Sequence, residues 1–110
     1  MNIEDLAAYG ANVEEGVSRC VGNEGLYLRL VESVKDDAHF AALETAIAEG
    51  RLDDAFEEAH GLKGSLGNLS LTPLYEPMVE ITELLRARTE TDYAPLLAKI
   101  SEERARLFSL

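Results

Sequence analysis

One short stretch of the chain, residues 57–70 (EEAHGLKGSLGNLS), combines a group that can react with residues that leave space around it. His60 offers an imidazole, whose neutral form is a nucleophile near pH 7. Three glycines follow within seven positions: Gly61, Gly64 and Gly67. Each glycine inside a helix costs roughly 0.5–1 kcal/mol relative to alanine, so the pattern indicates that something must approach this surface closely.

The spacing of the same stretch predicts what surrounds the imidazole. Turning residues 52–69 by about 100° per residue gathers the apolar side chains on one face and places His60 on the exposed flank. Gly64 and Gly67 fall on the same surface one and two turns later, where we expect a shallow bare patch. Lys63 lies one turn from His60, so its ammonium could contact an anion bound to the ring. This arrangement suits a phosphorylated histidine.

A plainer interpretation is an ordinary surface histidine beside a solvated lysine. It leaves the glycines unexplained, because Ala, Glu or Lys would serve a solvent-facing helix better. His39, in DDAHFAAL, could be a metal ligand together with Asp36 and Asp37. These three residues lack the helical i, i+4 spacing of metal ligands, so an ordinary surface histidine is favoured. Asp53 and Glu57 share the surface with His60, and we expect them to point away or to remain hydrated.

The elements that carry these residues are helices. Apolar residues recur at three- and four-residue spacing along almost the whole chain, which predicts an all-α protein. Two short helices are expected first, over residues 3–9 and from Asn12 towards Gly22, with Gly10 as a stop signal between them. We interpret residues 1–22 as an amino-terminal lid.

The rest of the chain, residues 23–110, is expected to form an antiparallel up-down four-helix bundle capped by the short amino-terminal helices. Asn23 is a start signal for the first segment, and Gly50 is a stop signal before residues 52–69. The apolar positions of the first segment are Leu26, Tyr27, Leu30, Val31 and Val34.

Prolines mark the starts of the last two helices. Pro73 and Pro77 place one start between them, and Thr91 or Asp92 can open the final helix, which tolerates Pro95 in its first turn.

With 110 residues, the chain fits one domain with one modest core.

Composition excludes several classes of function. The chain carries 21 acidic and 10 basic residues, a formal net charge of −11, which disfavours nucleic acid and anionic membranes as partners. Cys20 is the only cysteine, so it forms no internal disulfide, and we assign it no function. The acidic amino terminus does not resemble a signal peptide, and we expect a cytoplasmic location.

The residues AHGLKGSLGNL, from Ala59 to Leu69, resemble the motif of histidine-containing phosphotransfer (HPt) domains. In that motif a histidine precedes x-Leu-Lys-Gly, then small residues and an Asn followed by an apolar residue. The segment YGANVEEGVSRCVGNEGLYLRLVESV also looks like the beginning of free-standing members. Ser70 and Leu71 stand where many members have Gly-Ala, and Gly67 where a small Ala is common.

The resemblance implies a four-helix bundle that receives a phosphoryl group from a receiver-domain aspartate and passes it to another. By position, His60 is the phosphoacceptor, Lys63 the stabilising cation and Gly64 the residue that gives the receiver access. Gly61, Gly67 and Asn68 would belong to the docking surface. The partners would be receiver domains of response regulators or of hybrid histidine kinases, which would supply the divalent metal. The domain itself would need no cofactor.

Two other functions stay open from the sequence. One is a docking module that binds a signalling partner without being phosphorylated. The other is the phosphotransfer fragment of a multidomain histidine kinase. The chain begins with Met and ends just after its last expected helix, so we expect a free-standing protein. The chain has neither a GxGxxG nor a GxxxxGK[ST] nucleotide loop, so we expect a phosphocarrier and not a kinase. Because the bundle uses most apolar positions, we expect a monomer.

Overall fold

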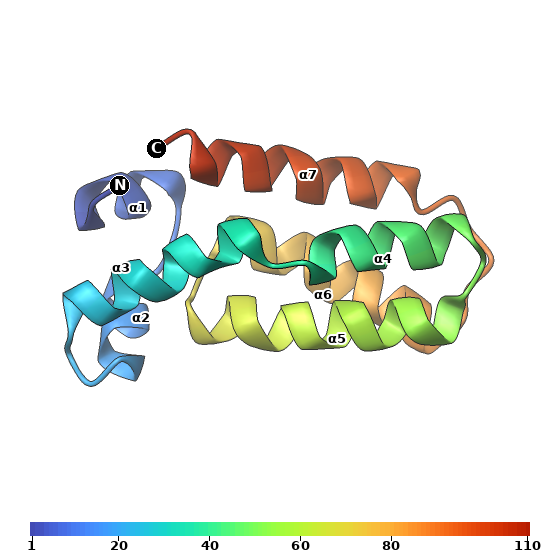
Figure 1. Ribbon diagram of the computed structural model, residues 1–110, viewed down its shortest axis with the longest axis horizontal. Helices are drawn as coiled ribbons and strands as arrows, with labels where there is room; N and C mark the ends of the chain where they lie inside the picture. The colour runs from blue at the N-terminus through green and yellow to red at the C-terminus, as the bar shows by residue number, and fades with distance from the viewer.

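The computed structural model describes residues 1–110 and shows an all-helical chain, which confirms the predicted all-α class. Two short helices, α1 (Ile3–Tyr9) and α2 (Val13–Arg19), lie at one end of an elongated molecule measuring 41 × 24 × 20 Å (Figure 1). The remaining elements are α3 (Glu24–Ser33), the 3-10 helix η1 (Val34–Asp36), α4 (His39–Ala48), α5 (Leu52–Asn68), α6 (Thr72–Arg86) and α7 (Ala94–Phe108).

The longer helices pack against their neighbours in chain order. The helix α4 contacts α5, α5 contacts α6, and α6 contacts α7. The chain reverses at Gly50, whose φ of +71° suits glycine, so α5 runs back along α4 (Figure 1). Near the middle of the molecule, α3 leads into α4 through η1, and at the end opposite Gly50, α1 lies against α7 (Figure 1).

Asparagine side chains start several of these helices, as the sequence predicts. The Oδ1 atom of Asn12 accepts a hydrogen bond from Glu15 N at 3.2 Å, and that of Asn23 accepts one from Leu26 N at 2.9 Å. Gly10 closes α1 in the left-handed region, at φ +116°. Local signals therefore fix where these helices begin and end.

The predicted starts of the last two helices need correction. The helix α6 begins at Thr72, before Pro73, and contains Pro77 in its interior. Pro77 has no N–H to give to the carbonyl one turn earlier, but its ring is buried, and burial offsets part of that loss. The helix α7 begins at Ala94 and not at Asp92, whose Oδ1 accepts from Ala94 N at 3.0 Å.

One cluster of 23 buried side chains extends from Leu6 in α1 to Leu107 in α7. The lid shares this core, and Tyr27 ties the next helix to the end of α5, since its hydroxyl donates to Leu69 O at 2.8 Å. Burial raises the pKa of the Tyr27 phenol to about 12. Leu30, which the apolar pattern assigns to the core, is 40% exposed. None of the helices has the length and apolar character needed to cross a lipid bilayer.

Candidate functional site

His60 lies in the middle of α5 with its side chain exposed to solvent. Ala59 and Leu62 beside it in the sequence are fully buried, and they fix which face of α5 turns to the core. The helical spacing of the apolar residues therefore determines that His60 points outwards. The imidazole stacks on the ring of Phe56, one turn earlier in the same helix.

The three glycines near His60 have different surroundings. A Cβ atom built on Gly61 or on Gly64 would meet no other group within 4 Å, so both leave open surface. A Cβ atom on Gly67 would lie 3.1 Å from Cε2 of Tyr75 in α6. Gly67 is half-buried, and its missing side chain lets α6 approach α5, so the surface there is less open than at Gly64. Gly67 still lines the polar hollow described next, and its place in a docking surface stays a prediction.

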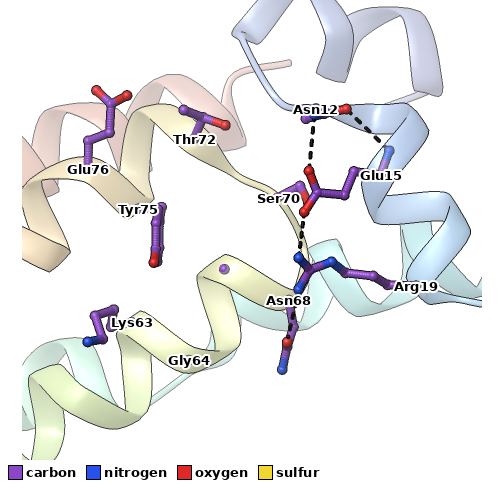
Figure 2. A pocket seen from close by; sticks show the side chains of 11 residues that line it. Asn12, Glu15, Arg19, Lys63, Gly64, Asn68, Ser70, Thr72, Tyr75 and Glu76 are labelled. Atoms are coloured by element: carbon purple, nitrogen blue, oxygen red, sulfur yellow. Dashed lines mark hydrogen bonds and ion pairs between the residues drawn. The ribbon is translucent and has the colours of Figure 1, made fainter.

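Lys63 and Gly64 line a polar hollow of about 560 Å³ between α5, α6 and the lid (Figure 2). Tyr75 faces Lys63 from α6, and Asn12 and Glu15 reach towards the hollow from α2 and its start. Lys63 is half-buried and belongs to none of the ion pairs of the chain. An unpaired ammonium one turn from His60 is therefore available to an incoming anion.

A second cation borders the same hollow. Arg19 of α2 contacts Glu15 Oε1 at 2.5 Å and donates to Asn68 Oδ1 at 3.4 Å (Figure 2). Asn68 is exposed at the carboxyl end of α5, so this contact joins the lid to the end of the histidine helix. Arg19 is therefore paired with a carboxylate, whereas Lys63 forms no ion pair.

The carboxylates near His60 are turned to other partners or to water. Asp53 is exposed and forms an ion pair with Arg88. Glu57 is exposed to solvent. Glu58, on the α4 side of α5, contacts His39 Nδ1 at 2.5 Å, and this hydrogen bond raises the pKa of His39, with help from the nearby Asp37 carboxylate. The acidic residues therefore do not close the approach to the imidazole.

The site offers an exposed nucleophile, an unpaired ammonium and an open helix surface, which is a set suited to carrying an anionic group on a ring nitrogen. No group of three or more His, Cys, Asp or Glu side chains is placed to hold a metal ion.

A family model described as Hpt domain matches residues 29–109, which is most of the chain. The chain therefore belongs to the Hpt domain family, as the motif around His60 predicts. The match leaves out α1 and α2. No curated protein matches the chain, and no solved structure matches it.

Sequence reasoning missed three contacts of the site. The apolar spacing of residues 52–69 assigns Phe56 to the core face, but its ring also stacks on His60. Its position four residues before the histidine is the signal that could have shown this. The contacts of Tyr75 with Gly67 and of Arg19 with Asn68 join residues far apart in the chain, and no local pattern predicts them.

Proposed function

We propose that this Hpt domain is a phosphocarrier in which His60 accepts a phosphoryl group from a receiver-domain aspartate and passes it to another receiver-domain aspartate. The observation that carries the proposal is the exposed imidazole beside a free ammonium on an open stretch of α5. Membership of the Hpt family supports it, because these domains take part in two-component signalling.

In this proposal, Lys63 stabilises the phosphoryl oxygens and Gly64 gives the receiver access to the ring. Gly61 and Asn68 border the same exposed surface and would contact the receiver, whereas Gly67 acts by allowing the close packing of α5 and α6. The helices α4 to α7, with α3 preceding them, would serve as an up-down four-helix bundle that presents α5 to the partner.

The domain would supply a positioned imidazole and a cation, while the receiver supplies a divalent metal ion and most of the charge stabilisation for in-line transfer. We propose no cofactor and no kinase activity for the chain itself, and a cytoplasmic location. The partners are receiver domains of response regulators or of hybrid histidine kinases. A carrier must release each partner, so we expect a small, low-affinity interface.

The experiment that tests this function is phosphoryl transfer to the purified chain from phosphorylated receiver domains. Wild type and His60→Gln are compared, and acid-labile, base-stable phosphate is counted. We expect label on the wild type and none on the variant. A folded wild type that takes no label from any of several receivers would contradict the proposal and favour a docking module that is not phosphorylated.

A further inference from the structure

The exposed ring of His60 is held by an aromatic contact and not by a polar one. Its centroid lies 5.5 Å from that of Phe56 and the two planes meet at 14°, which is the geometry of offset stacking. Neither ring nitrogen of His60 makes a hydrogen bond within the chain, in contrast to His39, whose Nδ1 contacts Glu58. The stack is therefore the contact that fixes the plane of the imidazole.

Phe56 is itself held from two directions. It is half-buried and packs against the core cluster. From α6, the guanidinium of Arg86 lies 4.8 Å from the centroid of the Phe56 ring, and Arg86 Nε also donates to Glu83 Oε2 at 3.3 Å. The phenyl ring is thus held at the junction of two helices, and it provides the surface on which the imidazole stacks.

The orientation of the ring matters because the lone pair of an imidazole nitrogen lies in the ring plane. An exposed histidine otherwise samples several rotamers, and only some of them aim that lone pair away from the helix. Stacking covers one face of the ring and leaves its edge free. A reacting partner that approaches along the edge then meets a nitrogen whose direction is already set.

We propose that Phe56 is a positioning residue for His60, and this inference rests on the proposed phosphocarrier function. In the transfer, the P–O bond of the donor aspartyl phosphate breaks as a P–N bond to His60 forms, and the aspartate leaves as a carboxylate. The proton on the other ring nitrogen stays in place during attack. Phe56 touches neither phosphorus nor receiver in this step; it limits the orientations of the nucleophile.

A positioning role predicts a specific kinetic change. Phe56→Leu removes the stacking surface but keeps an apolar side chain, so docking of the receiver should be unaffected. The maximal rate of transfer should fall by about 3- to 10-fold, the range that corresponds to the loss of one aromatic pair. Phe56→Tyr keeps the ring and should restore the rate.

The test is single-turnover transfer from a phosphorylated receiver domain, measured over a range of receiver concentrations to separate the maximal rate from half-saturation. A matched control is Phe40→Leu. The guanidinium of Arg104 lies over the Phe40 ring, 4.4 Å from its centroid, but Phe40 is in α4 and does not stack on His60. NMR of the His60 Hδ2 and Hε1 protons reports the stack directly, because the Phe56 ring current shifts them.

The supporting result is a slower maximal rate in Phe56→Leu with unchanged half-saturation, loss of the ring-current shift, and recovery of both in Phe56→Tyr. Equal slowing in Phe40→Leu, or wild-type transfer in Phe56→Leu, would overturn the positioning role while leaving His60 as the carrier. Absence of label on folded wild type would instead overturn the proposed function itself, and the inference with it. The two failures are therefore distinguishable.

Discussion

Lys63 differs from Arg19, the other cation that lines the polar hollow, because no carboxylate forms an ion pair with it. Arg19 is paired with Glu15 and Arg88 with Asp53, although the chain as a whole carries a net charge of −11. The Lys63 ammonium is half-buried and has no ion-pair partner, so a bound anion would stabilise it. At the residue scale, the site thus depends on the unpaired ammonium of Lys63 as well as on the imidazole of His60.

The open surface at Gly64 leads to a prediction about access. Gly64→Ala should raise the free energy of unfolding by about 0.5–1 kcal/mol, because a Cβ there meets nothing and alanine favours the helix. It should nevertheless slow phosphoryl transfer, because the methyl group stands where the receiver approaches. Urea denaturation and the transfer assay measure the two effects. A variant that is both more stable and as active as wild type would contradict the role of Gly64.

The contact between His39 and Glu58 predicts that His39 titrates at a higher pH than a free histidine. The hydrogen bond that the His39 ring donates to the Glu58 carboxylate raises the pKa of His39 above its ordinary value of 6.5, so the pair stabilises the fold fully below pH 6.5 and loses that effect as pH rises through the raised value. NMR titration of the His39 ring should give a midpoint above 6.5, and Glu58→Gln should lower it. An unchanged midpoint in the variant would show that the pair does not form in solution.

At the scale of elements, the lid is joined to the bundle by close packing as well as by hydrogen bonds. The helix α2 passes so near Tyr27 that a Cβ atom on Gly16 would overlap the Tyr27 ring. The helix α1 is tied to α7 by Tyr9, whose hydroxyl donates to Glu103 O at 3.1 Å, and by Arg106, which lies over the Tyr9 ring. These contacts make α1 and α2 part of the fold, although they lie outside the family match.

The contact of Gly16 predicts an unusual response to alanine. Alanine normally stabilises a helix, yet Gly16→Ala should lower the free energy of unfolding by about 1–2 kcal/mol, because the methyl group has no room beside Tyr27. Gly25→Ala in α3 is the control, because a Cβ there meets only Asn23 Oδ1 at 3.4 Å, and this variant should not lower the free energy of unfolding. Urea denaturation of both variants measures the difference. Equal effects would contradict the close packing of α2.

The ion pairs of Glu103 predict how acid affects the junction of α1 and α7. Burial acts to raise the pKa of this carboxyl, but hydrogen bonds from Lys99 and Arg106 outweigh burial and lower it. The stabilisation is therefore present above the ordinary carboxyl pKa and is lost as pH falls through the lowered value. Glu103→Gln should cost about 1–2 kcal/mol at pH 7 and much less in acid. Urea unfolding at both pH values tests this; a difference that persists in acid would contradict it.

At the scale of the molecule, the sequence predicts most of the fold because most of its signals are local. Asn12, Asn23 and Gly50 mark helix ends through contacts within a few residues, and the apolar spacing predicts which faces are buried. The start of α6 was misjudged because tertiary packing keeps Pro77 inside a helix that local rules would end. The contact of Gly67 with Tyr75 depends on the approach of two helices, which no local pattern contains.

The distribution of apolar surface predicts the oligomeric state. The large hydrophobic side chains that remain exposed are Val21, Leu30 and Leu110, in three different parts of the chain. Three such residues are too few to form the large apolar patch that a stable dimer interface needs. Light scattering should therefore give a mass near 12.1 kDa. A mass of about twice that value, independent of salt, would contradict the prediction.

The overlap between position 16 and the ring of Tyr27 also limits how this chain can diverge. A mutation that enlarges residue 16 is tolerated only after residue 27 has become smaller, so the order in which the two changes arise is constrained. Descendants that retain Tyr27 should therefore retain Gly16, whereas a larger residue at position 16 should occur only where residue 27 is smaller. An alignment of close homologues would show this as paired substitution, and frequent bulky residues at position 16 opposite a retained tyrosine would rule it out.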